Sequence, residues 1–300
     1  MFLFVRLDID KVSFMKLQAV VVLYKQKIAE SKSIRSLFDR IQSRNLDIDL
    51  LIYDNSPSPQ SCEHAITTLI SVIYTHDPTN GGLVPAYNQG LVLAKESGTD
   101  WLLLLDQDTI LTDRYFETLH GAIREHGADA RIAAYAPHII VRGKCVAPSW
   151  FFLGVHRHVK ISWHGIATKP VIGINSATVV RVSYVGSIGG FDERFPLNFT
   201  DYWLYREIYR SGKMVIVLDC GLDHELSAAN RDTFRPVPLY RDVLYHEGLF
   251  YRSSQSRIVV IVFWSRLMLR VLKHYVVFKD KGYSRTTFSY IWRELIARPR

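Results

Sequence analysis

The chain of 300 residues contains little cysteine. Its three cysteines, Cys62, Cys145 and Cys220, are far apart and form no Cys-x-x-Cys pair. The sequence therefore suggests neither a disulfide framework nor a zinc site, and a reducing cytoplasmic compartment is the simpler setting. The first six residues lack a basic region, and their apolar run is too short to predict a signal peptide.

Most of the chain also lacks an excess of positive charge. Residues 251–300 hold eleven Lys or Arg and two acidic residues, a net charge of +9, which leaves −1 for residues 1–250 of a chain whose total is +8. Because no basic stripe with interleaved aromatic residues occurs in the first 250 residues, we expect no nucleic-acid partner. Length and charge together predict an α/β domain over residues 1–250 and a basic helical tail over residues 251–300.

One run of apolar residues leads directly into two carboxylates. Residues 101–105, Trp-Leu-Leu-Leu-Leu, predict a strand buried on both faces, and Asp106 and Asp108 follow it. Ligands of open α/β sheets bind at the carboxyl ends of such strands. Two carboxylates this close repel each other unless a cation or several donors hold them, and a divalent metal that carries phosphate oxygens suits them.

Strand and helix patterns alternate along the chain, which predicts an α/β fold built from crossover units. Between residues 141 and 169 the pattern weakens, and His156, His158 and His164 are expected to be loop or strand histidines. We expect strands at residues 17–24, 48–53, 71–75, 100–108, 132–137, 172–180 and 215–218, and helices over residues 28–44, from the glycines at 81–82 to 96, over 113–126 and from 200.

Further polar residues lie at predicted strand or helix ends, and each has a structural alternative. Asp54 could accept from a base or a ribose, or could begin an ordinary Asp-Asn-Ser-Pro turn. The glycines after Asn80 could bring backbone amides close to an anion, although a glycine turn before a helix is common without a ligand. Asp201 could serve as a helix cap. His224, after the last predicted strand, could be a ligand or a structural histidine.

The basic tail contains an amphipathic helical pattern over residues 257–279. Its cations and its apolar residues are predicted on opposite faces. A transmembrane span is not expected, because each of three central cations would cost roughly 2.5 to 3.5 kcal/mol in a bilayer. The helix could lie on an anionic membrane surface, or pack its apolar stripe on the first domain with its cations in water. The predicted basic face holds Arg266, Arg270 and Lys273, and the opposite face holds Trp264, Met268, Val271 and Tyr275.

Together these motifs resemble the family 2 glycosyltransferases of the GT-A fold, and among them the rhamnosyltransferase-like members of polysaccharide assembly. The resemblance covers roughly residues 17–230. It rests on Asp54-Asn55-Ser56, the stretch from Asn80-Gly81-Gly82 to Asn88-Gln89-Gly90, Asp106-Gln107-Asp108-Thr109, Gly190-Phe191-Asp192-Glu193, and Asp201 ahead of Trp203 and Arg206.

The resemblance implies a mixed, mostly parallel sheet flanked by helices, and the basic tail would follow it as a helical C-terminal extension. It implies metal-dependent, inverting transfer of a single sugar, with rhamnose as a candidate, from a nucleotide-diphosphate sugar. The acceptor would be a hydroxyl of a glycan or a lipid-linked molecule in surface polysaccharide assembly. The expected location is the cytoplasm, with peripheral attachment to the inner face of the cell membrane as an option.

The resemblance also implies site residues. Asp201 would be the general base, and Asp108 and His224 would bind a divalent metal, Mg²⁺ or Mn²⁺. Relatives often have Tyr-Asn where this chain has Tyr24-Lys25, and no Gln-x-x-Arg-Trp motif follows Asp201, which argues for one sugar per encounter. The nucleotide sugar would be bound by Tyr24, Asp54, Asn55, Asn80, Gly82, Asn88, Asp106 and Gln107.

Two other functions stay open on the sequence. Asp-x-Asp-x-Thr after an apolar strand also looks like the first motif of haloacid-dehalogenase-type phosphatases, in which Asp106 would be the nucleophile and Asp108 the acid. That motif normally occupies the first strand, whereas about a hundred residues precede it here. A non-catalytic module that binds sugar nucleotides or polysaccharide would keep the same fold, although the presence of Asp106, Asp108 and Asp201 argues against a decayed site.

Overall fold

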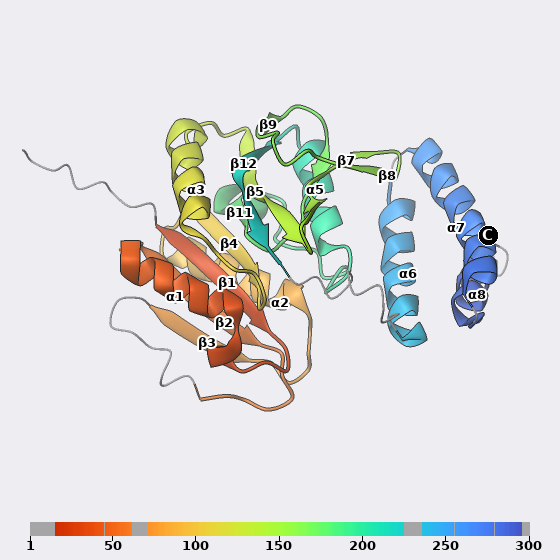
Figure 1. Cartoon of the computed structure of the whole chain (residues 1–300), viewed down its shortest axis with the longest axis horizontal. Helices are drawn as coiled ribbons and strands as arrows, with labels where there is room; N and C mark the ends of the chain where they lie inside the picture. The colour runs from red at the N-terminus through yellow and green to blue at the C-terminus, as the bar shows by residue number, and fades with distance from the viewer. Residues whose placement is uncertain are drawn as a thin grey trace, which may run out of the picture.

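Strands and helices alternate through most of the chain (Figure 1). The computed structural model describes residues 16–44, 46–61, 71–224, 236–254, 256–278 and 280–295. Its strands are β1 (Leu17–Leu23), β2 (Ile48–Asp54), β3 (Val72–His76), β4 (Trp101–Asp106), β5 (Ile132–Val141), β6 (Lys144–Ala147), β7 (Ser149–Phe152), β8 (Val155–His158), β9 (Gly165–Ala167), β10 (Val171–Ile172), β11 (Thr178–Arg181) and β12 (Met214–Asp223). Its helices are α1 (Lys32–Arg44), α2 (Leu83–Glu96), α3 (Asp113–His126), α4 (Val182–Ser187), α5 (Thr200–Arg210), α6 (Val237–Arg252), α7 (Arg257–Val277) and α8 (Gly282–Leu295).

The central sheet joins a parallel half to a mixed half. Its strand order is β3-β2-β1-β4-β11-β5-β12-β9, with β6 beside β5. Strands β1 to β4 pair in parallel, whereas β11 is antiparallel to both β4 and β5. On β1, Leu23 is in register with Asp54 and Val22 with Asp106, so both acidic strand ends lie at the same edge of the sheet. This is the edge at which open α/β sheets bind their ligands.

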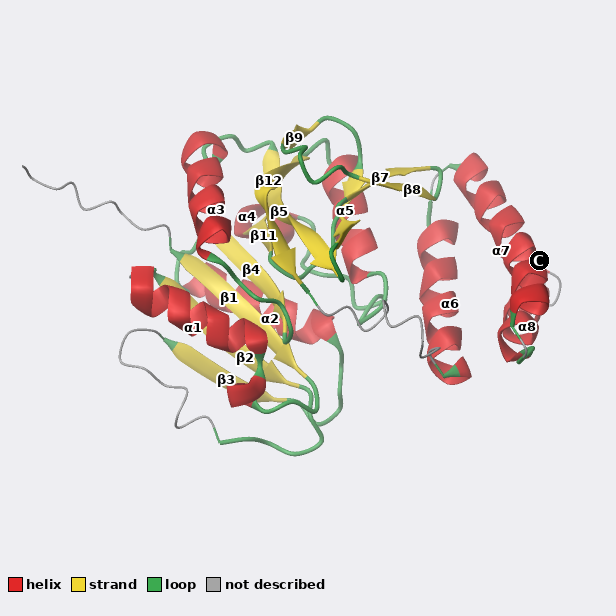
Figure 2. Cartoon of the chain, viewed as in Figure 1, coloured by secondary structure: helices red, strands yellow, loops and turns green. Residues whose placement is uncertain are grey.

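Helices cover both faces of this sheet, as Figure 2 shows. Along β1, Leu17 and Val21 face the layer that contains α1 and α3, whereas Val20 faces the layer that contains α2. Strands buried on both sides need no polar alternation, which explains the continuous apolar runs in the sequence. The packing of α2 is close enough to require Gly90, because a Cβ there would lie 2.1 Å from Cγ2 of Val20.

The predicted strands and helices are largely confirmed over the first 126 residues. The helix expected over residues 113–126 is α3, whereas the one expected from residue 28 begins at Lys32, after a short 3-10 turn over Ile28–Glu30. The single strand predicted over residues 172–180 is wrong, since β10 ends at Ile172 and β11 begins at Thr178. Ala177, between them, has a φ of 61°, a left-handed conformation that no strand continues through.

The segment of weak pattern, residues 141–169, contains short strands. β7 and β8 form a hairpin, and β10 pairs with β7 to complete a second sheet of three strands in the described chain. His156 and His158 lie on β8 and His164 precedes β9, so the expectation of strand or loop histidines is confirmed. Strands of two to four residues are too short for a period of two to be read from sequence.

The last three helices, α6, α7 and α8, stand beside one another at the end of the molecule opposite α1 and β3 (Figure 1). α7 confirms the predicted tail helix, whereas α6 and α8 were not predicted. Because α6 ends at Arg252, the predicted boundary after residue 250 falls inside a helix, and the division into two domains stays a prediction. Among the described residues, no helix combines the length and apolar character of a membrane span.

The predicted orientation of α7 is only partly right. Trp264 and Val271 pack against the core, as an apolar stripe should. However, the guanidinium of Arg270 turns inward and donates to both carboxylate oxygens of Glu247, at 2.6 and 2.7 Å. Met268, predicted beside Trp264, is 53% exposed. A buried acid on α6 thus reverses part of the amphipathic pattern, and periodicity within one helix cannot reveal that partner.

Candidate functional site

Hydroxyl groups from both sides hold the loop that follows β4. Oγ of Ser33, at the start of α1, contacts the carbonyl oxygen of Asp106 and accepts from the N–H of Thr109 at 2.9 Å. On the other side, Oγ of Ser176 accepts from the N–H of Asp106 at 3.1 Å. Since these bonds all involve the backbone, the carboxylates of the loop are left to point into the site.

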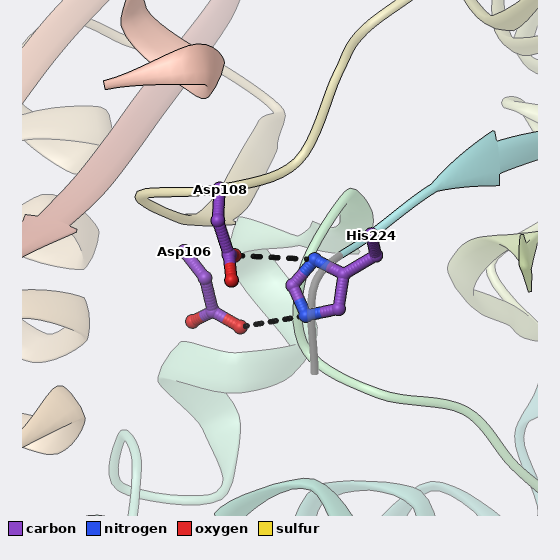
Figure 3. Close-up of side chains that lie close together, drawn as sticks. All are labelled: Asp106, Asp108 and His224. Atoms are coloured by element: carbon purple, nitrogen blue, oxygen red, sulfur yellow. Dashed lines mark ion pairs between the residues drawn. The ribbon is translucent and has the colours of Figure 1, made fainter. Parts of the chain in front are cut away.

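Asp106, Asp108 and His224 come together at the carboxyl end of β4 (Figure 3). One ligand atom from each lies within 4.8 Å of the other two. Nδ1 of His224 is 3.2 Å from a carboxylate oxygen of Asp108, and Nε2 is 3.9 Å from one of Asp106. β4 and the loop behind it supply the two carboxylates, and the end of β12 supplies the imidazole.

The His224 ring is fixed by contacts on two sides. Its backbone N–H donates to the carbonyl of Ile140 at 3.0 Å, which continues the pairing of β12 with β5. Its Nδ1 lies 2.8 Å from Oγ1 of Thr109, the residue that ends the Asp-Gln-Asp-Thr motif. His224 is 6% exposed. A nearly buried imidazole held toward two carboxylates is arranged as a ligand.

The carboxylates of the site repel one another. Burial, and then the charges of Asp108 and Asp201, raise the pKa of Asp106 to about 7. Two carboxylates and an imidazole are oxygen and nitrogen donors of the kind that Mn²⁺ accepts, and the carboxylates suit Mg²⁺ as well. A divalent cation would also remove the repulsion. The residues present therefore fit the predicted metal.

Asp201 lies in the first turn of α5. Its carboxylate accepts from the N–H of Tyr202 at 2.8 Å, and burial raises the pKa of Asp201 to about 6 despite this bond. The hydroxyl of Tyr202 is 3.2 Å from Nε2 of His156 on β8. The ring of Phe151 on β7 packs against Tyr202 with centroids 6.2 Å apart. The small sheet and α5 thus place aromatic groups next to the candidate base.

Asp54 lies at the end of β2, where protein donors surround its carboxylate. It is fully buried, and its two oxygens accept from Ser56, Gln60 and Tyr74 at 2.8 to 2.9 Å. Burial acts to raise the pKa of Asp54, but these hydrogen bonds outweigh it and lower the pKa. The carboxylate therefore holds the turn after β2, which is the structural alternative, and its contact with a nucleobase stays a prediction.

Asn55 follows Asp54 and is also buried. Its side-chain amide donates to the carbonyl of Gly82 at 2.9 Å, while its Oδ1 is buried with no hydrogen-bond partner among the described residues. It therefore links the end of β2 to the start of α2. One acceptor of Asn55 is therefore unpartnered among the described residues, and nucleotide binding by Asn55 stays a prediction.

Tyr24 and Gln107 meet at the edge of the site. The N–H of Tyr24 donates to the side-chain oxygen of Gln107 at 2.8 Å, and the Tyr24 side chain is 41% exposed. The carbonyl of Gln107 accepts from the hydroxyl of Ser31 at 2.8 Å. Two of the predicted nucleotide-binding residues therefore lie together beside the strand end of β4.

The start of α2 does not present its amides as expected. The N–H groups of Leu83 and Val84 both donate to the carbonyl of Pro196, at 2.6 and 3.3 Å. Gly82 is required there, since its φ is 89° and a Cβ would lie 2.4 Å from that carbonyl oxygen. The paired glycines thus permit a close approach of protein backbone. The prediction that this helix start presents free amides to an anion is wrong, because the carbonyl of Pro196 accepts from them. Asn80 lies before it in an exposed turn.

Asn88 forms two hydrogen bonds to the backbone of the loop that contains Phe191. Its amide donates to the carbonyl of Phe191 at 3.1 Å and its oxygen accepts from the N–H of the same residue at 2.8 Å. Both polar groups are therefore engaged by the Gly-Phe-Asp-Glu segment. Donor binding by Asn88 stays a prediction, and the contact shows that the two motifs lie side by side.

Tyr87 was missed by the sequence analysis. It is fully buried on α2, and its hydroxyl has no hydrogen-bond partner in the part of the chain that the structure describes. Burial, and then the charges of Asp106 and Asp201, raise the pKa of Tyr87 well above its usual value, so the hydroxyl keeps its proton. A tyrosine inside an apolar helical stripe looks like core in a sequence. Only the fold brings this one near two carboxylates.

Comparison of the sequence with known families gives one match over more than half of the chain. The profile of the family described as glycosyl transferase family 2 matches residues 19–186. This range includes β4, the loop that carries Asp106 and Asp108, and α2. No curated protein matches the sequence.

Solved structures of similar fold include three glycosyltransferases. GalNAc-T7 with UDP, GalNAc and Mn²⁺ has a TM-score of 0.56 and 12% identity; the match covers 95% of this chain, which spans only 57% of the GalNAc-T7 chain. TarS 1–349 of S. aureus has a TM-score of 0.54 and 15% identity, with 92% of this chain and 91% of that chain covered. The mannosyltransferase PcManGT from Pyrobaculum calidifontis, in complex with GDP-Man and Mn²⁺, has a TM-score of 0.55 and 11% identity, with 96% and 89% covered. At these identities the likeness shows the fold alone.

Proposed function

The chain belongs to glycosyl transferase family 2 and has the GT-A fold, and from this premise we propose that it transfers one sugar from a nucleotide-diphosphate sugar to an acceptor hydroxyl. The cluster of Asp106, Asp108 and His224 carries the proposal, because it joins a strand-end carboxylate pair to a third ligand. GalNAc-T7 with UDP and Mn²⁺ and the mannosyltransferase with GDP-Man and Mn²⁺ support a donor of this class.

In the proposed reaction, Asp108 and His224 hold Mg²⁺ or Mn²⁺ and Asp106 lies toward the nucleotide. A cation bound there would supply charge neutralisation for the leaving diphosphate. The serine and threonine hydroxyls around the loop keep both carboxylates in place, so little reorganisation is needed when the donor binds. Three of the proposed nucleotide contacts fit their surroundings best. They are the exposed ring of Tyr24, the unpartnered acceptor of Asn55, and the side chain of Gln107, which lies beside Tyr24.

Asp201 is the proposed general base. With a pKa of about 6, its carboxylate is mostly deprotonated at neutral pH, and only that form can take the proton of an acceptor hydroxyl. Attack on the anomeric carbon from the face opposite the diphosphate is a single displacement. One displacement needs one base and inverts the configuration.

The finer assignments are part of the proposal. Rhamnose is the candidate sugar, and a glycan or lipid-linked molecule of surface polysaccharide assembly is the candidate acceptor. The absence of Gln-x-x-Arg-Trp after Asp201 supports one sugar per encounter. The free thiols of Cys145 and Cys220 support a cytoplasmic location, and attachment to the inner face of the membrane is a further part of the proposal.

Two other functions are weighed against this one. Family membership favours the transferase over a phosphatase with Asp106 as nucleophile. The raised pKa of Asp106 also disfavours it as a nucleophile at neutral pH unless a cation lowers that pKa. A non-catalytic module would bind the donor without turning it over. An assay of sugar transfer therefore distinguishes such a module from the proposed transferase.

The test is transfer from a panel of nucleotide sugars with Mg²⁺ or Mn²⁺. Asp108→Ala is expected to lower transfer and metal-dependent donor hydrolysis by about 10²–10³-fold. Asp201→Asn is expected to lower transfer by about 10²–10⁴-fold while donor and metal still bind. Asp39→Asn is the matched control, because this exposed residue of α1 lies outside the site.

Full activity in both variants would make the site assignment wrong. Donor binding without turnover in the unaltered chain would favour the binding module. Release of phosphate from simple phosphate esters, abolished by Asp106→Asn, would favour the phosphatase.

A further inference from the structure

The outward face of α7 is apolar. Ile258, Ile261, Met268, Leu272 and Tyr275 follow one another at intervals of three, seven, four and three residues, which places them in one stripe along the helix. Their exposed fractions range from 53% to 64%. Leu269 and Val276 widen this stripe and are 65% and 79% exposed. We call these seven residues the outer stripe of α7.

This stripe is not needed to attach α7 to the rest of the molecule. The inward side of the helix buries Phe263 and Leu267, and Phe263 stacks on Tyr251 of α6 with centroids 4.9 Å apart. Arg270 binds Glu247 on the same side. Since the helix is already anchored by these contacts, its large exposed apolar residues are free to meet another surface. An apolar patch of this kind marks an interaction site.

α8 exposes large apolar residues as well. Phe288, Trp292 and Leu295 are each slightly more than half exposed and recur at intervals of four and three residues. The rings of Phe288 and Trp292 stack with centroids 6.4 Å apart. Tryptophan and phenylalanine are common on the apolar face of helices that lie in a lipid interface.

The charges around the outer stripe indicate what covers it. Exposed cations lie on both helices, at Arg257, Lys273, Arg285 and Arg293. Among the described residues from 256 to 295, Asp280 is the exposed acid, while Glu294 is bound by Arg252. A second copy of this face would bring like charges together, whereas anionic lipid headgroups complement them.

We propose that the outer stripe of α7, with the exposed aromatic residues of α8, docks on an anionic lipid bilayer surface. The helix lies in the interface, with its apolar side chains among the acyl chains and its cations at the headgroups. The faces differ from those predicted from sequence, because Arg266 and Arg270 are turned toward Gly154 and Glu247, while Trp264 and Val271 pack on the core.

The docked helix is connected to the acceptor side of the site. Arg266 donates to the carbonyl of Gly154, in the turn of the β7–β8 hairpin. Behind that turn, the ring of Phe151 lies 6.4 Å from Tyr251 and 6.2 Å from Tyr202, the neighbour of Asp201. A bilayer against α7 would bring a lipid-linked acceptor to the side where the proposed base Asp201 lies. This one point rests on the proposed function.

The test is sedimentation of the full chain with vesicles, without any donor. Wild type is expected to sediment with phosphatidylcholine vesicles that contain phosphatidylglycerol, and much less with phosphatidylcholine alone. Leu269→Gln with Leu272→Gln should weaken that partitioning by at least about tenfold, because two exposed leucines no longer enter the acyl region. Val276→Gln should weaken the partitioning less. Val92→Gln, the same change at an exposed position of α2, should not weaken it.

Unchanged sedimentation of the double variant would overturn the proposal, as would equal binding to neutral vesicles. A dimer in solution that the double variant abolishes would also overturn it, in favour of a second copy. Transfer to a water-soluble acceptor should be the same in the wild type and the double variant. Vesicle binding is measured without sugar transfer. A failure of the membrane proposal and a failure of the proposed transferase activity can therefore be told apart.

Discussion

Asp54 and Asp106 end the two strands that flank β1, yet their surroundings differ in kind. Protein donors saturate Asp54, and its pKa is lowered even though it is fully buried. Asp106 has Asp108 and Asp201 as neighbours, and its pKa is raised to about 7. Both follow an apolar strand in the sequence, and both are near the same edge of the sheet.

From this difference we propose a structural role for Asp54 and a functional role for Asp106. A carboxylate whose lone pairs are filled by Ser56, Gln60 and Tyr74 stabilises a turn and has little left to offer a ligand. Carboxylates that repel one another store unfavourable energy until a cation or a ligand relieves it. In this molecule the second condition occurs where Asp106, Asp108 and His224 meet.

Between the two strand ends, the larger expected effect is on catalysis and comes from Asp106→Asn. Removing one carboxylate of the cluster should lower transfer by about 10²–10³-fold and weaken Mn²⁺ binding, because a site charge is lost. The fold should be retained, since the change removes a repulsion. Transfer rates and Mn²⁺ titration by calorimetry measure the two effects.

Asp54→Asn is the counterpart at the other strand end. It should lower the free energy of unfolding by about 1–3 kcal/mol, because buried donors lose an acceptor, while Mn²⁺ affinity stays that of the wild type. Urea unfolding provides the comparison. If Asp54→Asn instead weakened Mn²⁺ binding as much as Asp106→Asn does, the division into structural and functional carboxylates would be wrong.

The next effect is on the pH dependence of transfer. Burial raises the pKa of Asp201 to about 6, so a base that must be deprotonated should lose activity below that pH and keep it above. At saturating Mn²⁺ and donor, kcat/KM for the acceptor should fall about tenfold for each pH unit below 6. The residual activity of Asp201→Asn should lack this limb. A limb with the same midpoint in the variant would assign it to another group.

The smallest effect is expected from Tyr87→Phe. Its hydroxyl lies near Asp106 and Asp201 with no partner among the described residues, which suits a contact with the donor sugar. Losing one neutral hydrogen bond should lower kcat/KM for the donor about three- to tenfold and leave the free energy of unfolding unchanged. The phenylalanine ring keeps the packing on Phe191. Unchanged kinetics would show that the Tyr87 hydroxyl does not contact the donor sugar.

Much of the first half of the chain could be predicted from sequence because its signals are local. Continuous apolar runs predicted β1, β2 and β4, and helical periodicity predicted α3 to the residue. Because parallel strands bring their carboxyl ends to one edge, the sequence alone predicts that Asp106 and Asp108 lie together at that edge. His224 joins them because β12 pairs in parallel with β5, which ends on the same side.

The second half was harder to predict because its elements are short or depend on distant partners. β7 to β10 hold two to four residues each, and the left-handed φ of Ala177 divides what looked like one strand. The helix start at Gly82 offered the pattern of an anion site, but the carbonyl of Pro196 occupies it. Likewise, nothing within residues 257–279 shows that Glu247 draws Arg270 inward.

Sequence by itself determined the alternation of strands and helices, the position of the Asp-Gln-Asp-Thr loop after a buried strand, and the concentration of positive charge in the tail. These follow from hydrophobic period and from covalent neighbours. Tertiary structure alone decided which carboxylate is saturated, that Tyr87 lies near two acids, and that the outer stripe of α7 faces outward. The reason is that a side chain's pKa, hydrogen bonds and exposure depend on groups far along the chain, and only the packed fold brings those groups into contact.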